Sequence, residues 1–561
     1  MTESAYALGV DFGTESGRAL LLDLRTGQEA AVSEVAYAHG VIDRELPQSG
    51  DRSVGERRRP GRDPVEIGQL PPDWALQHSD DWLAVLDVAI PAVLEQVPSA
   101  RDAVVGLGVD FTSCTMLPVT ADGLPLFTQE GWRSRRHAWP KLWKHHAAQP
   151  IADRLNEVAV ARGETFLERY GGRISSEWYF PKLIEVWLED REVYDACHGF
   201  IEATDWIVWF LTGSECRQSC TAGYKAMWSQ EEGLPSVDYF EAAYPGFDRP
   251  AAKLGTEFAP LGTRAGTLRP ELAVRLGLRE SVAVAVGNVD SFVSVAGAGV
   301  ESPGTFVMVV GTSICDLVID PAEVRLPGIT GVVRDGILPG LYGYEAGQAA
   351  VGDMLAWFIE TLAPPGAEHA ALEHAAAAIG PGATGLVALD WWNGNRTILA
   401  DADLSGALFG LTLQTTREQI YRALLESIAF GNRRIIENFE EHGLQLNEIV
   451  ACGGIAEKSP LTMQLLADTS GLRVSVPDST QIPARGAALF GAVAAGFFPD
   501  IGSAIAATRP GIARSYLPDA DAEAIYDRVY AIYRSLYERL GRMDVELLHG
   551  LKRIHSERSM S

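Results

Sequence analysis

Cysteine is scarce in this sequence, with six residues in a chain of 561. Their positions show no framework spacing. Cys216 and Cys220 lie close together, but no nearby His or Cys pair completes a zinc site. A disulfide-stapled fold and a structural zinc module are therefore excluded. We predict free thiols in a reducing cytoplasm.

Long apolar runs are also missing, because no stretch reaches the ~18–20 residues that span a bilayer. The longest candidate, Gly486 to Phe498, is short and rich in Gly and Ala, which predicts a packed core helix. The N-terminus carries Glu3 and Asp11 but no Lys or Arg before Arg18, so it does not resemble a secretory signal. We expect no membrane span and no secretion.

Positive charge is in deficit, since 47 Lys and Arg residues against 74 Asp and Glu residues give a formal net charge of −27. Such an acidic surface repels phosphate backbones and anionic lipid, so nucleic acids and membrane surfaces are not expected partners. A small anionic ligand is still compatible, because a few backbone N–H groups and one metal ion outweigh the distant field. The length predicts about two to four domains.

The common phosphate-binding signatures are absent as well. The chain has no Walker loop (GxxxxGK[ST]) and no protein-kinase catalytic set. Instead, a hairpin pattern occurs twice: residues 6–23 turn at Gly13-Thr14, and residues 306–320 turn at Gly311-Thr312. The second copy follows a Gly- and Pro-containing connection at 297–304. This recurrence predicts a duplicated α/β architecture.

The strand and helix patterns define the predicted domains. In the second half, a helix expected over 417–442 is followed by a strand over 448–452, which is typical of α/β proteins. We predict an N-terminal lobe over 1–297 and a C-terminal lobe over 298–561, which ends in a helical tail.

The polar composition from Glu29 to about Asp73 predicts a long surface insertion in the first lobe. It includes the basic cluster Arg57-Arg-Arg-Pro-Gly-Arg62, for which a solvated loop is the favoured interpretation and a contact with a partner the alternative.

The first Gly-Thr turn follows an acid, Asp11, at the end of its strand. Glycine at a hairpin tip, here Gly13, lets backbone N–H groups face an anion, and Thr14 adds a hydroxyl donor. Asp11 is the candidate metal residue, because a carboxylate at a strand end holds Mg²⁺ through water. A plain hairpin turn is the alternative for an isolated match.

Gly311-Thr312 and Gly453-Gly454 are further candidates for nucleotide contacts. The position equivalent to Asp11 is Val309, as expected if two lobes enclose one nucleotide and a single acid faces the metal. Gly453-Gly454 lies between a strand and a helix, where paired glycines let a flat base or a phosphate approach the backbone. Three such turns in two repeated halves indicate a nucleotide between two lobes.

A phosphoryl-transfer enzyme of this kind needs a base for the attacking hydroxyl. Asp290 follows the apolar run Ser281–Val286 and a Gly-Asn turn, and it is the candidate catalytic base. A surface or helix-capping aspartate is the alternative interpretation.

These motifs resemble the FGGY carbohydrate kinases, in which Asp11-Phe-Gly-Thr14, Val286-Gly-Asn-Val-Asp290, Gly311-Thr-Ser313 and Gly453-Gly454 have counterparts in the same order. The resemblance covers residues 6 to about 500. Further segments resemble the branch of the family that phosphorylates L-ribulose: Tyr37-Ala-His-Gly40, Leu70-Pro-Pro-Asp-Trp-Ala-Leu-Gln77, Val109-Asp-Phe-Thr-Ser-Cys-Thr-Met-Leu-Pro118, Leu142-Trp-Lys-His-His146, Cys220-Thr-Ala-Gly-Tyr-Lys225, Tyr344-Glu-Ala-Gly-Gln348 and Asp390-Trp-Trp-Asn-Gly-Asn-Arg396.

The resemblance implies two lobes of the actin/hexokinase (ribonuclease H-like) type and transfer of the γ-phosphoryl group of ATP, with Mg²⁺, to the terminal hydroxyl of L-ribulose in L-arabinose catabolism. By matching position, Asp290 would be the base, and Lys225, Glu345 and the Ser113-Cys114 turn would hold the sugar oxygens. An ammonium donates and a carboxylate accepts, so each discriminates hydroxyl positions. The resemblance also implies a homodimer, and it assigns the sugar to the N-terminal lobe and ATP to the C-terminal lobe.

The chain departs from the wider family at two places. Asp401-Ala-Asp-Leu-Ser-Gly406 lacks the Pro and Arg of the common stretch, which weakens a xylulose-kinase assignment. Glu457 stands where glycerol kinases carry Asn on the adenine side. His145 and His146 are interpreted as a solvated or capping pair, since the reaction needs no imidazole.

Two alternatives stay open. The chain is compatible with a kinase for another ketopentose or polyol, such as D-ribulose, ribitol, D-xylulose or glycerol. It is also compatible with an actin-like or chaperone-like ATPase, whose hydrolysis is indifferent to sugars and needs no Asp290. The intact Asp11, Thr14 and Asp290 argue against a catalytically dead sugar sensor.

Overall fold

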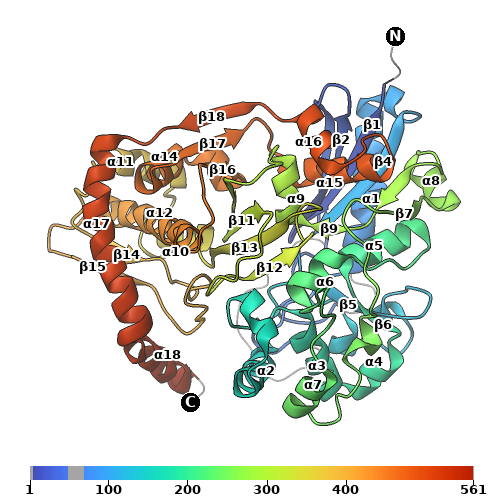
Figure 1. Cartoon of the computed structure of the whole chain (residues 1–561), viewed down its shortest axis with the longest axis horizontal. Coiled ribbons are helices and arrows are strands. Elements are labelled where there is room, and N and C mark those ends of the chain that lie inside the picture. The colour runs from blue at the N-terminus through green and yellow to red at the C-terminus, as the bar shows by residue number, and fades with distance from the viewer. Residues whose placement is uncertain (1–3, 48–68, 560–561) are drawn as a thin grey trace.

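The computed structural model describes residues 4–47 and 69–559. Within these residues the strands form two seven-stranded sheets, one in each half of the chain, and two short two-stranded sheets (Figure 1). We call residues 4–297 the first half and residues 298–559 the second half. The two large sheets carry the turns predicted to bind the nucleotide.

The first sheet has the strand order β3-β2-β1-β4-β8-β7, with β9 paired to β4. β1 pairs antiparallel with β2 and parallel with β4, so the ends of β1 and β4 lie at the same edge. The strands are β1 (Tyr6–Phe12), β2 (Ser16–Asp23), β3 (Glu29–Ala36), β4 (Val104–Phe111), β7 (Arg264–Thr267), β8 (Ala283–Ala285) and β9 (Asn288–Val289).

The second sheet repeats this order as β13-β11-β10-β16-β17-β18, with β12 added at its edge. β10 pairs antiparallel with β11 and parallel with β16, as β1 does with β2 and β4. The strands are β10 (Thr305–Val310), β11 (Ile314–Asp320), β12 (Gly331–Arg334), β13 (Tyr342–Gln348), β16 (Glu448–Cys452), β17 (Arg473–Pro477) and β18 (Ile512–Tyr516). The predicted duplication of an α/β architecture is confirmed.

Helices occupy equivalent places in the two repeats. One helix precedes the central parallel strand in each half, a second lies between the parallel strands, and a third follows the last parallel strand. In this order the pairs are α1 (Ser79–Gln96) and α12 (Arg417–Glu441), α5 (Ala203–Thr212) and α14 (Pro460–Ser470), and α9 (Asp290–Gly297) and α15 (Ile482–Ala494).

The long helix α12 has clear end signals in the sequence. Thr416 accepts a hydrogen bond from the Gln419 N–H at 3.3 Å, and the Gln419 side chain accepts one from the Thr416 N–H at 2.9 Å, which is a capping box. At the other end Gly443 has a φ of +92°, a left-handed conformation that glycine adopts without strain. The helix predicted over 417–442 is confirmed.

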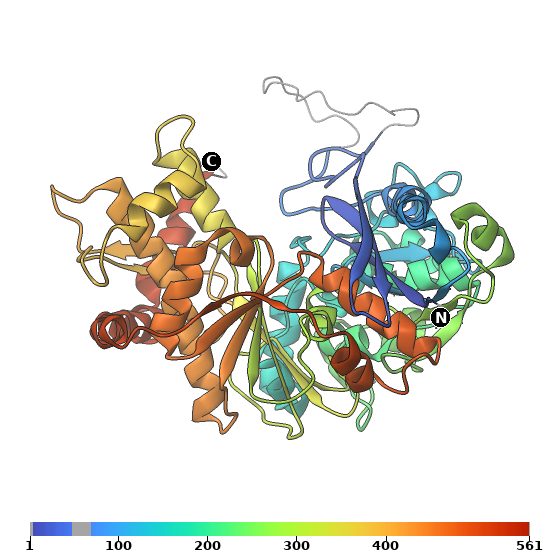
Figure 2. The same ribbon diagram turned by 90° about the horizontal axis from the view of Figure 1, so that it is seen from above.

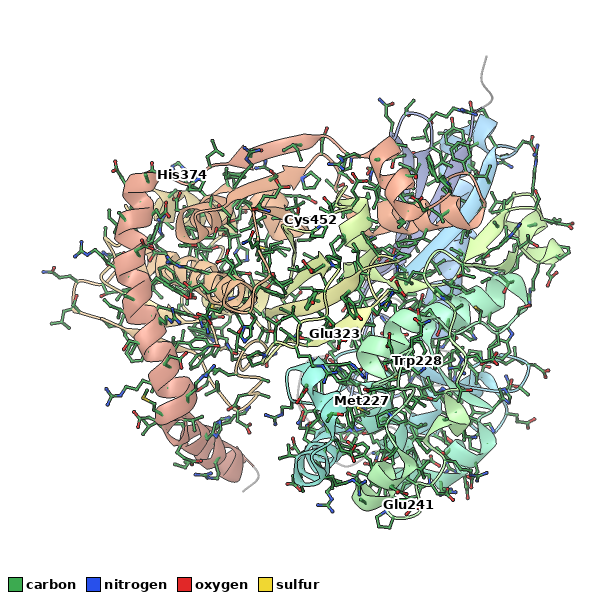
Figure 3. The ribbon with its side chains drawn as sticks, in the orientation of Figure 1. Met227, Trp228, Glu241, Glu323, His374 and Cys452 are labelled. Carbon is green, nitrogen blue, oxygen red and sulfur yellow. The ribbon has the colours of Figure 1, made fainter. Side chains whose placement is uncertain are left out.

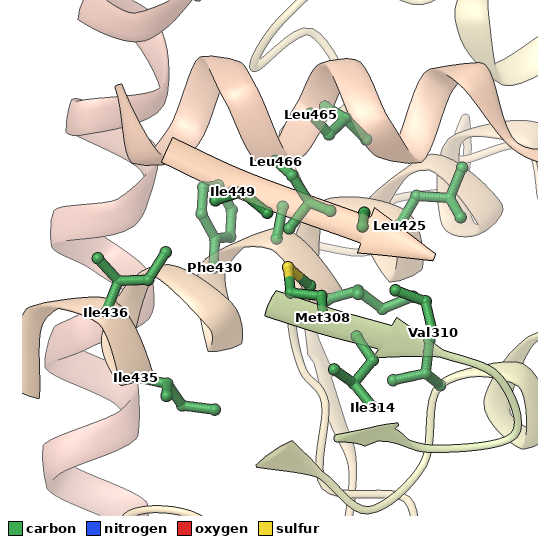
Figure 4. Packing of buried hydrophobic residues seen from close by; sticks show 14 of the residues in the cluster. Met308, Val310, Ile314, Leu425, Phe430, Ile435, Ile436, Ile449, Leu465 and Leu466 are labelled. Carbon is green, nitrogen blue, oxygen red and sulfur yellow. The ribbon is translucent and has the colours of Figure 1, made fainter. Parts of the chain in front are cut away.

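The core of the second half lies between its sheet and these helices (Figure 4). Met308 of β10 and Ile449 of β16 pack against Leu425 and Phe430 of α12, and Leu466 of α14 covers the same cluster. Burial of this apolar set holds β10 and β16 in a fixed register, which in turn fixes the turns at their ends.

Helix α15 belongs to the second half in sequence but packs on the first sheet, as does the chain around α16 (Ile501–Thr508) (Figure 2). A Cβ atom on Gly9 would lie 1.7 Å from the Ala484 carbonyl oxygen, and one on Gly108 would lie 1.9 Å from that of Ala487. Only glycine allows so close an approach. The core helix predicted within 486–498 is confirmed, and the lobe boundary after Gly297 stays a prediction. No helix in the described part of the chain is long and apolar enough to cross a membrane.

The predicted surface insertion at 29–73 is wrong for its first residues, because Glu29–Ala36 form β3 and pair with β2. β3 lies at the sheet edge and exposes many of its side chains, so its composition looks like that of a loop. Residues 48–68, with the basic cluster Arg57-Arg-Arg-Pro-Gly-Arg62, lie outside the described residues.

A block of helices between β4 and β8 adds to the first half (Figure 1). It contains α2 (Gln149–Arg162), α3 (Tyr179–Glu189), α4 (Arg191–Ala196), α6 (Ser219–Lys225) and α7 (Val237–Ala243). In the second half, α10 (Gly352–Thr361) follows β13, and the chain ends in α17 (Ala520–Glu538) and α18 (Glu546–Ser559), so the predicted tail is helical.

Candidate active site

The two Gly-Thr turns lie at the tips of equivalent hairpins. The Gly13 N–H donates to the Ser16 carbonyl and the Gly311 N–H donates to the Ser313 carbonyl, each at 2.9 Å. The N–H groups of both glycines therefore close their own turns. These two N–H groups are therefore not available to a phosphate, and the predicted phosphate contacts of both turns, including those of Thr14 and Thr312, stay predictions.

Each turn is also held from outside. The Thr14 carbonyl accepts a hydrogen bond from the Gln77 amide at 2.9 Å, and the Thr14 hydroxyl accepts one from the Trp143 indole N–H at 3.0 Å. The Thr312 carbonyl accepts one from the Val351 N–H at 2.9 Å, just before α10. Sequence reasoning missed Gln77 and Trp143, because neither is near residue 14 in the chain.

Three carboxylates gather where the strands of the first sheet end. Asp11 and Asp110 are register neighbours on β1 and β4, and the Arg18 guanidinium lies 3.2 Å from the Asp11 carboxylate. Asp110 is fully buried, and neither of its carboxylate oxygens has a hydrogen-bond partner. Burial, with the charges of Asp11 and Asp290, raises the pKa of Asp110 well above its usual range.

Asp290 is the first residue of α9, and the Ser291 N–H donates to its carboxylate at 2.6 Å. Burial raises the pKa of Asp290 to about 7, and the charge of Asp11 adds to the rise. A carboxyl with this pKa exists in both protonation states near neutral pH, which suits a general base.

Two predicted sugar residues contact each other across the halves. The Lys225 ammonium, at the end of α6, lies 2.6 Å from the Glu345 carboxylate on β13, and both side chains are buried. Burial alone would lower the pKa of Lys225, but the charge of Glu345 outweighs it and the pKa is raised. The Lys225 ammonium lies 5.8 Å from the centre of the Phe292 ring on α9, two residues after Asp290, and the charge of Glu345 acts on Asp290, so the ion pair lies near the candidate base.

The Ser113-Cys114 turn is held by a lysine that sequence reasoning missed. Cys114 has a φ of +62°, and its carbonyl accepts a hydrogen bond from the Lys182 ammonium at 2.7 Å. Lys182 is fully buried in α3, and burial lowers its pKa to about 8. A lysine within the apolar run Tyr179–Val186 was the signal that could have revealed it.

Glu177 and Arg396 form a second charged set near this site. Burial alone would raise the pKa of Glu177, but the charges of Arg396, His146, Lys182 and Lys225 lower it. Among the described residues, the closest ion-pair partner of the Glu177 carboxylate is His146 at 3.9 Å, and Arg396 has no ion pair. The sequence motif contained Arg396, but nothing in the sequence linked it to residue 177.

The paired glycines lie beside the second hairpin. Gly453 has a φ of +93°, and a Cβ there would lie 2.6 Å from the Val310 carbonyl oxygen. Gly454 begins the short helix α13 (Gly454–Lys458), and a Cβ on it would meet no atom within 4 Å. The space beside Gly454 is therefore open, while Gly453 packs closely on the strand end that precedes Gly311.

Two other expectations have clear outcomes. All six cysteines are free, as predicted. His145 is not solvated: it is fully buried and bonded to Glu185 at 2.9 Å beside Lys141, and burial lowers its pKa to about 3. The apolar Trp74 ring packs edge-on against it, which explains its burial.

A cavity of about 210 Å³ lies between the halves, where Trp228 and Glu323 line it (Figure 3). None of the predicted site residues lines this cavity. It is therefore separate from the site that contains Asp290 and Lys225.

A magnesium ion requires oxygen ligands and keeps much of its water, so one or two carboxylates suffice when substrate phosphates supply the rest. Asp11 and the unpartnered Asp110 match that requirement. In the described part of the chain, no group of three His, Cys, Asp or Glu side chains forms a complete metal site. The donor set fits an ion that arrives with a nucleotide.

Comparison with known sequences gives near-full-length matches. Residues 306–495 match the FGGY family of carbohydrate kinases, C-terminal domain. The chain is 46% identical to "Ribulokinase" of Anoxybacillus flavithermus over 98% of this chain and 96% of that protein. It is 43% identical to "Ribulokinase" of Mycolicibacterium smegmatis over 96% of this chain and 94% of that protein.

Comparison with solved structures supports the same fold. A xylulose kinase from Rhodospirillum rubrum aligns with a TM-score of 0.76 at 22% identity, over 95% of this chain and 99% of its own. A glycerol kinase from Plasmodium falciparum, solved with ADP, aligns with a TM-score of 0.74 at 13% identity, over 95% and 98%. At these identities the likeness concerns the fold alone.

Proposed function

This chain belongs to the FGGY family of carbohydrate kinases, and on that basis we propose that it transfers the γ-phosphoryl group of ATP to the terminal (C5) hydroxyl of L-ribulose. The family predicted from the sequence motifs is confirmed, and the chain is a carbohydrate kinase. The relatives named ribulokinase support ribulose as the sugar and L-arabinose catabolism as the setting.

One structural observation carries the proposal: an aspartate with a raised pKa, Asp290, lies near the buried Lys225–Glu345 pair. Phosphoryl transfer to an alcohol needs one base and a rigid set of donors and acceptors for the sugar. The Lys225 ammonium donates, the Glu345 carboxylate accepts, and each is fixed by burial. This is the chemistry that a polyhydroxylated substrate requires.

In the proposed mechanism Asp290 accepts the proton of the attacking hydroxyl. Lys225, Glu345 and the Ser113-Cys114 turn orient the sugar so that this hydroxyl faces Asp290. Approach of the two halves would exclude water, which is a rival nucleophile.

The nucleotide is assigned to the hairpins and the paired glycines. Thr14 and Thr312 bind its phosphates, and Gly453-Gly454 accommodate the base or the neighbouring phosphate. Asp11 and Asp110 would hold Mg²⁺, which neutralises phosphate charge when it is bound.

The test is ADP release from Mg-ATP with L-ribulose, D-ribulose, D-xylulose, ribitol and glycerol supplied separately. Strong stimulation by L-ribulose is the expected result. Stimulation by glycerol or D-xylulose alone would support a carbohydrate kinase but reject L-ribulose as its substrate. Hydrolysis indifferent to every sugar would favour the switch ATPase and reject Asp290 as the base.

The homodimer and the cytoplasmic location are further proposals, which the family supports. Sedimentation equilibrium of the purified chain tests the first: a mass near 121 kDa, about twice the chain mass of 60.6 kDa, is expected. A mass near that of one chain would reject it.

A further inference from the structure

The hydroxyl of Thr14 has a defined direction in this structure. Its oxygen accepts the hydrogen bond from the Trp143 indole N–H at 3.0 Å. An indole N–H is only a donor, so at this contact the hydroxyl can only accept. The proton of the Thr14 hydroxyl is therefore left for another acceptor, and a phosphate oxygen is such an acceptor.

The backbone of Trp143 is fixed by the same lysine that fixes the sugar turn. The Lys182 ammonium donates to the carbonyls of Cys114 at 2.7 Å, Leu142 at 2.9 Å and Trp143 at 3.5 Å. An ammonium has three N–H groups, so these three carbonyls use all of them. Lys182 has no exposed surface, and water does not compete for these bonds.

We propose that Trp143 is a positioning residue that couples the Ser113-Cys114 turn to the Thr14 hydroxyl, so that sugar and nucleotide bind cooperatively. The inference rests on the proposed function, which assigns the sugar to the Ser113-Cys114 turn and the phosphates to the Gly13-Thr14 turn. The continuous path of contacts runs from Cys114 through Lys182 and Trp143 to Thr14.

The physical basis is a shared ordering cost. A sugar bound at Ser113-Cys114 restrains that turn and, through Lys182, the backbone of residues 142 and 143. Trp143 then holds the Thr14 hydroxyl with its proton directed to the phosphate, so the nucleotide meets a site that is already ordered. Coupling between two ligands is reciprocal, and it typically changes affinity by about 5–150-fold.

The experiment measures L-ribulose affinity by calorimetry with and without a non-hydrolysable ATP analogue and Mg²⁺. In the unaltered enzyme we expect the analogue to tighten sugar binding at least about fivefold. In Trp143→Phe, which keeps a ring but loses the N–H, we expect that factor to fall toward one. Sugar affinity without the analogue and the thermal unfolding midpoint should stay unchanged.

Trp206→Phe is the matched control, because the Trp206 indole N–H also donates a hydrogen bond. Its acceptor is the Gly123 carbonyl at 2.8 Å, which is not part of this path. It should leave the coupling intact. Thr14→Ala and the double variant Trp143→Phe with Thr14→Ala complete the set. If Trp143 acts through the Thr14 hydroxyl, the double variant couples as weakly as Thr14→Ala does and no more weakly.

The outcomes separate the two proposals. An unaltered enzyme that binds no L-ribulose rejects the proposed function and this inference together. An enzyme that binds both ligands independently rejects the inference alone. Full coupling in Trp143→Phe, or a further loss in the double variant beyond Thr14→Ala, also overturns it.

Discussion

The two halves share one strand order but differ in chemistry at the ends of their central parallel strands. In the first half Asp11 and Asp110 are register neighbours, and Arg18 faces Asp11 across the hairpin. In the second half the equivalent positions hold Val309, Cys452 and Cys315. A duplicated scaffold thus supplies two similar turns, whereas only the first half carries charged side chains at these three register positions.

Asp290, the proposed base, should show the largest difference in effect between the two halves. We expect Asp290→Asn, which keeps the shape but cannot accept the proton, to lower turnover by about 10²–10⁴-fold. Affinity for the ATP analogue, measured by calorimetry, should stay within about twofold. Asp478→Asn is the control, because Asp478 follows β17 in the second half and is exposed, and it should leave turnover unchanged. Near-normal turnover of Asp290→Asn would contradict the assignment.

The raised pKa of Asp290 gives a second readout of the same residue. Because the carboxyl must lose its proton to act as a base, kcat/KM should rise as the pH passes upward through about 7. A rate profile from pH 5.5 to 8.5 measures this. A flat profile in the unaltered enzyme would mean that Asp290 does not limit the reaction.

The ion pair between the halves should show the next largest effect. Lys225→Met leaves the buried Glu345 carboxylate unpaired, and we expect a loss of about 3–5 kcal/mol in the free energy of unfolding. The KM for L-ribulose should rise about 100-fold or more, because one donor and one orienting charge are lost. Urea unfolding and initial rates measure the two effects.

The control for Lys225→Met is an exposed pair of similar type. Arg191 and Asp195 lie 3.0 Å apart with side chains 54% and 60% exposed, so Arg191→Met should cost less than about 1 kcal/mol. Adding Glu345→Met to Lys225→Met removes the unpaired charge and should recover stability but not sugar binding. Equal losses of unfolding free energy in Lys225→Met and Arg191→Met would show that the buried pair between the halves contributes no more than an exposed pair.

The parts of this site that the sequence predicts are those whose chemistry is local. A few neighbouring residues are enough to recognise a Gly-Thr turn after a strand that ends in an acid, or an aspartate after a Gly-Asn turn. Both hairpins form as expected. Lys182 and Glu177 could not be assigned, because their partners lie on segments far away in the chain. The edge strand β3 was missed for a different reason: an exposed face makes a strand look polar.

Glu177 and Arg396 extend the comparison with the charges reversed. Here the acid lies in the first half and the cation in the second, whereas Lys225 lies in the first half and Glu345 in the second. The closest ion-pair partner of the Glu177 carboxylate, His146, lies 3.9 Å away, which is beyond hydrogen-bond distance, so the carboxylate can accept a hydrogen bond from a sugar hydroxyl. We expect Glu177→Gln to weaken L-ribulose binding about tenfold, as the loss of a hydrogen bond to a charged group does. Calorimetry measures this, with the exposed Glu157→Gln as control. Unchanged affinity would place Glu177 outside the sugar site.

The smallest effect concerns stability and uses a buried aspartate from each half. Asp110 and Asp316 are both fully buried with no hydrogen-bond partner for either carboxylate oxygen, and burial raises the pKa of both. A carboxyl with a raised pKa in the folded state holds its proton more tightly there than in the unfolded chain. Its presence therefore destabilises the fold as the pH rises above the usual carboxyl pKa.

Asp110→Asn and Asp316→Asn should each raise the free energy of unfolding at pH 8 by about 1 kcal/mol, with a smaller gain at pH 5. Only Asp110→Asn should also weaken binding of Mn²⁺ with the ATP analogue, because only Asp110 adjoins Asp11 at the strand ends. Calorimetry and urea unfolding on both variants decide the matter. If both variants weaken metal binding alike, or neither does, the strand ends of the first half do not hold the metal, and the asymmetry between the halves does not extend to it.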